Sequence, residues 1–253
     1  MVAAPAFSKT TDVKAKSAVQ PVRILVVGDS LSAEYGLKRG SGWVALLENR
    51  LAESVNWNEK PRKSSSLNSK ITTNTIAPQA INTPATTENG IKIAPNFTVI
   101  NASISGDTTS GGRSRLAPLI DMHHPTHVII ELGANDALRG LPVAKTEENL
   151  TAMVQTALQS KAKVLLVGIQ IPPNYGAEFT KQFTATYPKI AKANNVGLVP
   201  FMLTGVADSP NFAKLFQADR IHPTEAAHPT ILNNIWPELQ KQLKSTSSSK
   251  AKK

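Results

Sequence analysis

The feature that most constrains the fold of this chain is a repeated alternation of short apolar runs with longer amphipathic segments. The apolar runs are rich in Val and Ile, and such alternation is typical of βα units around a parallel sheet. We therefore expect an α/β fold, namely a flavodoxin-like, three-layer α/β/α sandwich with a five-stranded parallel sheet. The expected strands cover residues 22–27, 97–102, 127–132, 163–169 and 197–201.

The segments between these strands predict helices. In the first, Ser41 is expected to cap a helix whose apolar positions Val44, Leu47 and Leu51 recur with helical spacing. Proline lacks the backbone N–H that a helix interior needs, so we expect the last two helices to be kinked or shortened. The other expected helices cover 108–122, 146–161, 179–194 and 224–243, and the prolines concerned are Pro188 and Pro237.

The chain is expected to hold one folded domain with flexible additions. Residues 21–243 are assigned to a single domain, because all predicted strands and helices fall within them. Residues 56–95 lack a sustained apolar period and are rich in Ser, Thr, Asn, Lys and Pro, which predicts a disordered insertion. Residues 1–20 predict a flexible segment that resembles the end of a secretory signal, and the Lys/Ser-rich residues 244–253 predict a flexible tail.

The positive charge of the chain belongs to these predicted flexible parts. The net charge is +10, and residues 1–20, 56–92 and 241–253 supply the whole excess. The rest of the chain is neutral overall and has no basic face interleaved with aromatics, which argues against nucleic acid as a partner. At most, the distribution favours peripheral contact of the basic tail with an anionic membrane. The chain has no cysteine, and no apolar run approaches the ~20 residues that span a bilayer.

A serine follows the first predicted strand, at the edge where parallel sheets bind their ligands. The apolar run before Ser30 predicts a buried strand, which places the hydroxyl just beyond its carboxyl end. A hydroxyl needs a base to act as a nucleophile at neutral pH, and His222 is the best candidate. Asp219, three residues earlier, can accept from the imidazole and fix its tautomer. Alone, Gly-Asp-Ser is an ordinary turn and His222-Pro223 could start a helix; at one sheet edge, they predict a serine hydrolase.

An acyl-transfer enzyme also needs hydrogen-bond donors for the oxyanion of its transition state. The amides of Ser30 and Gly106 can supply two, since a glycine lets the backbone approach closely, and the side-chain amide of Asn135 can supply a third. Taken singly, Gly106 also fits a simple turn, and Asn135 fits a turn at a strand end. Their places after the second and third predicted strands bring both residues to the same sheet edge as Ser30.

Two further clusters in the sequence are candidates for binding sites. The histidines at 123, 124 and 127 have no carboxylate or thiolate partners at metal-ligand spacing, so we expect no metal site. The glycine-rich stretch 106–114 is not a phosphate-binding P-loop, because Gly112 stands where that motif has lysine. From these residues we therefore expect neither a metal site nor a P-loop.

Four blocks of the chain resemble the signature blocks of the SGNH hydrolases, also called GDSL esterases and lipases. The resemblance is closest to the bacterial branch of multifunctional thioesterase I, lysophospholipase and arylesterase enzymes, and it covers roughly residues 22–55 and 96–243. The blocks are 28–32, 101–108, 131–136 and 219–223, and the similarity extends to 138–141, 171–176 and 187–189.

The resemblance implies a triad of Ser30, Asp219 and His222, an oxyanion hole from Ser30, Gly106 and Asn135, and hydrolysis of acyl esters and thioesters without a cofactor. Relatives in this branch are usually exported, which implies a periplasmic or secreted protein. The alternative is a cytoplasmic location. The chain departs from the pattern where glycine is common, and none of these departures removes a catalytic group. The departing residues are Glu34, Ala134 and Arg220.

We thus expect a monomeric serine hydrolase that forms an acyl-enzyme on Ser30 and acts as an arylesterase, lysophospholipase or acyl-CoA thioesterase. Its expected partner is a small acyl ester, thioester or lysophospholipid. The alternatives are an SGNH esterase for acetylated carbohydrate and a non-catalytic, flavodoxin-like binding module, which would leave Asp219 and His222 unexplained. The side chains expected to offer an apolar wall to an acyl chain are Leu138, Leu141, Ile171 and Pro172.

Overall fold

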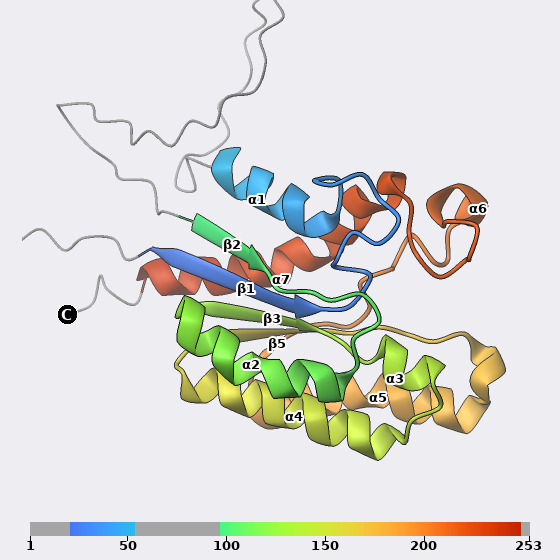
Figure 1. Cartoon of the computed structure of the whole chain (residues 1–253), viewed down its shortest axis with the longest axis horizontal. Coiled ribbons are helices and arrows are strands. Elements are labelled where there is room, and N and C mark those ends of the chain that lie inside the picture. Colours follow the sequence, from blue (N-terminus) through green and yellow to red (C-terminus); the bar gives the residue numbers. More distant parts are fainter. Residues whose placement is uncertain (1–20, 54–96, 249–253) are drawn as a thin grey trace, which may run out of the picture.

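A computed structural model describes residues 21–53 and 97–248, which form a five-stranded sheet enclosed by helices (Figure 1). Neighbouring strands are all parallel, in the order β2-β1-β3-β4-β5. The strands are β1 (Val22–Gly28), β2 (Phe97–Asn101), β3 (His127–Glu131), β4 (Lys163–Val167) and β5 (Gly197–Val199). This arrangement confirms the predicted α/β fold and its five-stranded parallel sheet.

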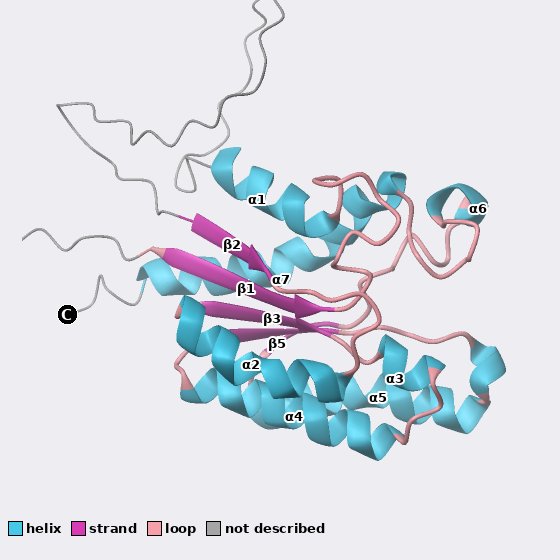
Figure 2. Cartoon of the chain, viewed as in Figure 1, coloured by secondary structure: helices cyan, strands magenta, loops and turns pink. Residues whose placement is uncertain are grey.

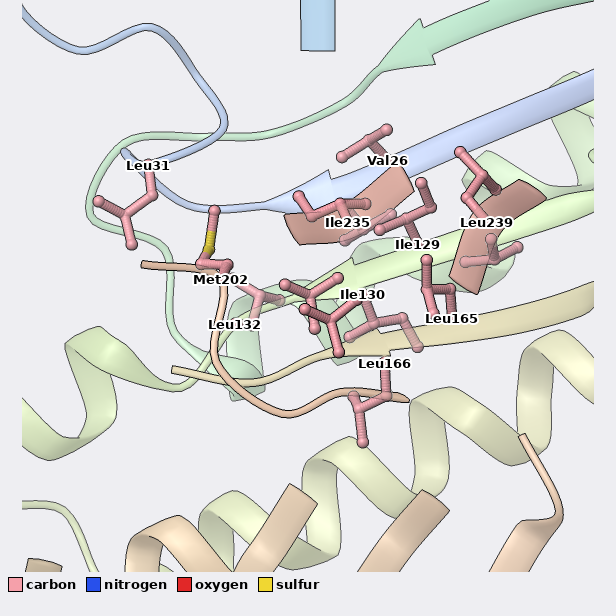
Figure 3. Close-up of a cluster of buried hydrophobic side chains, with 14 of the residues drawn as sticks. Val26, Leu31, Ile129, Ile130, Leu132, Leu165, Leu166, Met202, Ile235 and Leu239 are labelled. Atoms are coloured by element: carbon pink, nitrogen blue, oxygen red, sulfur yellow. The ribbon is translucent and has the colours of Figure 1, made fainter. Parts of the chain in front are cut away.

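The central strands are buried on both faces. All residues of β3 are buried, and so are nearly all of those in β1 and β4. Strands covered by helices on both sides need apolar side chains in both directions, which is why their sequences are continuous rather than alternating. Figure 3 shows the result, with side chains of β1, β3 and β4 gathered beside those of the last helix; the labelled residues include Val26, Ile129, Leu165, Ile235 and Leu239.

Helices form the two outer layers (Figure 2). Helices α1 and α7 contact each other on one face of the sheet, and α2, α4 and α5 pack together on the other. The helices are α1 (Trp43–Glu53), α2 (Thr109–His123), α3 (Ala134–Leu138), α4 (Val143–Gln159), α5 (Ala177–Asn194), α6 (Phe212–Leu215) and α7 (His228–Ser248), with 3-10 turns η1 (Pro173–Tyr175) and η2 (Glu225–Ala227).

Helix ends are where the structure departs most from the sequence predictions. Helix α5 continues through Pro188 and α7 through Pro237, so neither proline shortens its helix. Helix α7 also runs to Ser248, which makes residues 244–248 part of a helix instead of the expected flexible tail. The short helices α3 and α6 and the turn η1 were not predicted, because three to five residues are too few to establish a helical period.

The predicted cap of the first helix is also wrong. Helix α1 begins at Trp43, and the hydroxyl of Ser41 donates instead to the carbonyl of Lys38 at 2.6 Å. The N–H of Trp43 donates to Nδ1 of His228 at 3.0 Å, so a side chain from the start of α7 satisfies this helix end. Burial lowers the pKa of His228 to about 4, which keeps the imidazole neutral and able to accept that hydrogen bond.

Several sequence predictions fall outside the described residues. The N-terminal segment 1–20, the whole of the proposed insertion at 56–95 and the end of the lysine-rich tail all lie there. Within residues 21–53 and 97–248, the helices are too short or too polar to cross a membrane.

The strand order indicates where a ligand would bind at the sheet. The chain runs from β1 outward to β2 and then returns to the other side of β1 to form β3, so the order reverses at β1. In open parallel sheets, ligands bind beyond the carboxyl ends of the strands at such a reversal. Figure 1 shows that the loops after β1, β2 and β3 and the segment around α6 lie at this common end.

Candidate active site

The turn after β1 holds Ser30 in a fixed position at the end of the sheet. Strand β1 ends at Gly28, and the carboxylate of Asp29 then accepts a hydrogen bond from the N–H of Leu31 at 3.0 Å. A Cβ atom on Gly28 would lie 2.8 Å from the side chains of both Glu131 and Ser32. Only glycine therefore fits at the end of this strand, and the turn that follows is packed closely against β3.

A closed loop between α6 and η2 carries His222. An antiparallel bridge joins Phe216 to Pro223, and the N–H of Gln217 donates to the carbonyl of His222 at 2.8 Å. Inside the loop, one carboxylate oxygen of Asp219 accepts from the N–H of His222 at 3.0 Å and from the N–H of Ile221 at 2.9 Å. Local hydrogen bonds thus fix the distance between Asp219 and His222, as their spacing of three residues suggests.

The structure brings the three predicted triad residues together. Nε2 of His222 lies 2.8 Å from the hydroxyl oxygen of Ser30, and Nδ1 lies 2.7 Å from the second carboxylate oxygen of Asp219. Partial desolvation works against ionisation of Asp219, but hydrogen bonds from the His222 ring and from the N–H groups of His222 and Ile221 outweigh it and lower its pKa to about 2. An ionised Asp219 accepts from Nδ1–H, which leaves Nε2 as an acceptor facing the hydroxyl of Ser30.

The backbone N–H groups of Ser30 and Gly106 lie at this end of the sheet and have no acceptor among the described residues. The backbone of Gly106 has a φ of +79°, a conformation that favours glycine. The next residue, Asp107, is held by Arg115 through an ion pair of 2.8 Å, which anchors the turn beside the site. Free N–H groups held in place by the backbone are suited to stabilising a developing oxyanion.

The side-chain amide of Asn135 lies at the same edge but is already engaged. Its nitrogen donates to a carboxylate oxygen of Asp29 at 3.1 Å and to the carbonyl of Asp107 at 2.9 Å. Because this nitrogen carries only two hydrogens, Asn135 can act as a third oxyanion donor only by sharing or exchanging one of these bonds. The sequence suggested the position of this amide but not its hydrogen bonds.

The predicted apolar wall is only partly available to a substrate. Ile171 is buried in the hydrophobic core, so little of its side chain can contact a ligand. Leu138 is partly buried, whereas Leu141 and Pro172 are exposed. The role of these residues in binding remains a prediction.

Three apolar side chains that the sequence analysis missed are exposed next to the site residues. The ring of Tyr35 lies 4.3 Å from the ring of His222, at an interplanar angle of 39°. Ile221 directly precedes His222, and Ile104 lies two residues before Gly106; all three side chains are about half exposed. Their proximity in sequence to Ser30, His222 and Gly106 is the signal that could have identified them. Exposed apolar residues beside reactive groups often mark a ligand-binding surface.

Two departures from the family pattern have a backbone explanation. Glu34 and Arg220 have φ angles of 59° and 58°, in the left-handed region where glycine is least strained. Glu34 offsets the strain because its carboxylate accepts from the N–H groups of Gly40 and Gly42 and closes the loop after the Ser30 turn. Arg220 lies in a turn in which its own N–H donates to the carbonyl of Gln217 at 2.9 Å.

Metal ligands are not assembled in the described part of the chain. No group of three or more His, Asp or Glu side chains there is arranged to hold an ion. His127 begins β3, at the opposite end of that strand from Glu131, and is buried. His123 ends α2 and His124 follows as its cap, so the three histidines are divided between a helix end and the sheet.

Comparison with known proteins identifies the family of this chain. Residues 82–229 match the GDSL-like Lipase/Acylhydrolase family. The chain is 40% identical to Esterase TesA of Pseudomonas aeruginosa over 217 residues, which cover 86% of this chain and 87% of the relative. It is 35% identical to an arylesterase of Vibrio mimicus over 221 residues, 87% of this chain and 90% of that one.

Solved structures show the same similarity. The crystal structure of TesA has a TM-score of 0.68 at 40% identity and covers 87% of this chain and 98% of its own. The psychrotrophic esterase EstA from Pseudoalteromonas, in a structure inhibited by monoethylphosphonate, has a TM-score of 0.68 at 34% identity, with 88% and 98% covered. The chain therefore belongs to the GDSL-like lipase/acylhydrolase family and is an ester-hydrolysing enzyme.

Proposed function

We propose that Ser30 is the nucleophile of this hydrolase, with His222 as its general base and Asp219 as the residue that orients the imidazole. The observation that carries this proposal is the continuous hydrogen-bonded chain from Ser30 through His222 to Asp219. The hydroxyl attacks the acyl carbon while Nε2 takes its proton, and the ionised carboxylate of Asp219 stabilises the resulting imidazolium.

The remaining steps use the same groups. The free N–H groups of Ser30 and Gly106 stabilise the oxyanion of the tetrahedral intermediate, and Asn135 adds a third donor as it exchanges a hydrogen bond. The imidazolium of His222 then gives its proton to the leaving alcohol or thiol, which forms the acyl-enzyme. Attack by water, activated by the same imidazole, releases the acid and restores Ser30.

The proposed substrates are acyl esters and thioesters with an apolar acyl chain, including aryl esters, acyl-CoA and lysophospholipids. Similar proteins support this range, because one is named arylesterase and a protein of Escherichia coli, 34% identical over 217 residues, is named Thioesterase 1/protease 1/lysophospholipase L1. The exposed side chains of Tyr35, Ile104 and Ile221 support it physically, since they offer apolar surface beside the proposed nucleophile.

A panel of substrates tests this proposal. Purified protein is assayed with p-nitrophenyl esters of increasing chain length, palmitoyl-CoA, lysophosphatidylcholine and an acetylated oligosaccharide. We expect turnover of the first three classes and a preference for acyl chains longer than acetyl. Cleavage of the acetylated oligosaccharide alone would replace the proposed substrate class with a carbohydrate ester. Absence of any turnover in folded protein would favour a binding module instead.

A periplasmic or secreted location belongs to the proposal as well, and it rests on the family resemblance alone. Fractionation of cells that express the full chain tests it, with the esterase activity of each fraction as the measurement. Activity that stays with the cytoplasmic fraction would contradict it.

Replacing Asn135 with Ala tests the third oxyanion donor. We expect kcat to fall by roughly 10²–10³-fold with little change in KM, because the amide is proposed to bind mainly the transition state. Steady-state kinetics on p-nitrophenyl butyrate provide the measurement. A raised KM with unchanged kcat would instead make Asn135 a substrate-binding residue.

A further inference from the structure

A buried acid lies beneath the proposed nucleophile. Glu131 is the last residue of β3 and the register partner of Gly28, the last residue of β1. Its side chain is completely buried, and it forms no ion pair among residues 21–53 and 97–248. One of its oxygens, Oε1, is buried without a hydrogen-bond partner. Such a group at the end of a core strand is costly and calls for a physical reason.

The other oxygen of Glu131 contacts the residues on both sides of Ser30. Oε2 accepts a hydrogen bond of 2.6 Å from the hydroxyl of Ser32 and a long one of 3.5 Å from the N–H of Asp29. The indole of Trp43 donates to the same hydroxyl at 3.1 Å, so the hydroxyl is held between α1 and β3. Glu131 is thereby the point where the Ser30 turn is fastened to the neighbouring strand.

A second buried carboxyl group lies beside the first. Asp29 is completely buried and accepts hydrogen bonds from the N–H of Leu31 and from the side chain of Asn135, the proposed third oxyanion donor. Burial raises the pKa of Asp29 to about 7. The hydrogen bond from Leu31 opposes this rise, and the charge of the nearby Asp107 adds to it. Burial and the charge of Asp29 raise the pKa of Glu131 well above its ordinary value.

The groups around this pair do not neutralise it. Asp107 from the loop after β2 and Asp136 from α3 are acidic. Tyr187 from α5 is a phenol whose own pKa is raised by burial and by the charges of Glu131, Asp29 and Asp136. The cation Arg115 from α2 donates to the carbonyl of Gly28 at 3.4 Å but is paired with Asp107. Ionisation of Glu131 next to an ionised Asp29 would therefore place two negative charges in the core without a counter-ion.

We propose that Glu131 is a positioning residue for the esterase reaction. Its carboxyl group holds the Ser30 turn through Ser32 and Asp29, and it does so only while it keeps its proton. The inference rests on the proposed function of Ser30. In the neutral acid, Oε2 still accepts from Ser32 and Asp29, and no negative charge is buried beside the unpartnered Oε1. Loss of the proton from Glu131 creates a negative charge that repels the carboxylate of Asp29. A displaced Asp29 in turn disturbs the amide of Asn135, which donates to it.

The test uses two substitutions of the same residue. Glu131→Gln keeps the shape and the acceptor oxygen but cannot ionise, so we expect kcat near neutral pH within about threefold of wild type. Glu131→Ala removes the contact, and we expect kcat to fall by at least about tenfold with KM nearly unchanged, because small misplacements of reacting groups cost rates of this order. Steady-state kinetics on p-nitrophenyl butyrate give both values.

The pH profile separates positioning from simple packing. Wild-type kcat is expected to fall at alkaline pH as Glu131 ionises, and the plateau of Glu131→Gln is expected to extend at least about one pH unit further. His127→Gln, which replaces a buried residue at the far end of the same strand, serves as the matched control and should leave the alkaline limb where it is in wild type. Identical alkaline limbs in wild type and Glu131→Gln would overturn the proposal, and so would a folded Glu131→Ala variant with nearly normal kcat.

Stability against pH gives a readout that does not depend on the reaction. A raised pKa means that the folded state keeps a proton that the unfolded chain releases, so stability is greatest below the unfolded pKa and falls as pH rises toward the folded one. Glu131→Gln removes this dependence, and its thermal midpoint should gain on that of wild type as pH rises. If this occurs while kcat is indifferent to Glu131, the residue is a structural acid only; loss of labelling by a phosphonate ester in Ser30→Ala reports separately on the proposed nucleophile.

Discussion

Replacing Ser30 with Ala is expected to lower kcat for p-nitrophenyl butyrate by at least about 10³-fold, because the attacking oxygen is removed while only N–H donors remain. The thermal midpoint should change little. Ser30 is only partly buried, and its side chain makes one hydrogen bond, to His222, so it contributes little to packing. Activity and thermal unfolding measured on the same preparation provide the test.

A phosphonate ester that modifies serine hydrolases supplies the matching control. Wild-type protein should be labelled once, at Ser30, and the Ala variant should not be labelled at all. Residual activity within tenfold of wild type in the Ala variant would remove Ser30 from the mechanism, and labelling at another residue would identify the replacement.

Replacing His222 with Gln is expected to lower kcat by roughly 10²–10⁴-fold, the range of a general base. Glutamine can still donate a hydrogen bond toward Ser30, but it cannot accept its proton at neutral pH. Because p-nitrophenol leaves as the acyl-enzyme forms, a slower pre-steady-state release of p-nitrophenol should show that acylation itself is slowed.

A second histidine provides the control for this variant. His228 begins α7, shortly after the closed loop that carries His222. It is buried and accepts from the N–H of Trp43 at the start of α1. Gln in its place should reduce stability and leave kcat close to wild type in the folded protein. A His222→Gln variant with nearly normal acylation would exclude the proposed base.

The sheet was predictable from sequence because the buried strands have continuous runs of apolar residues. The run from His127 to Glu131 is enclosed by helices on both faces, so its apolar character is continuous and its length matches the strand. Helix ends were less predictable. The cap of α1 comes from His228, which is 185 residues away from Trp43 in the chain, and no local pattern reports such a contact.

The candidate site divides in the same way. Ser30, Asp219 and His222 could be named because each stands in a short motif at the end of a strand or in a tight loop. The engagement of Asn135 by Asp29 could not, since it depends on how the turns after β1 and β3 face each other. Glu131 was hidden for a related reason, because a single acid at the end of an apolar run predicts a strand end rather than a buried carboxyl group.

The closed loop from Phe216 to Pro223 has a consequence for how this enzyme fails. Because Asp219 and His222 are joined by bonds within that loop, they move together, and their mutual distance survives a displacement of the whole segment. The hydrogen bond between His222 and Ser30 is the joint that depends on how the loop packs against the sheet. Heat or distant mutations that loosen this packing are therefore expected to break the contact between Ser30 and His222 first, while the contact between Asp219 and His222 is still intact.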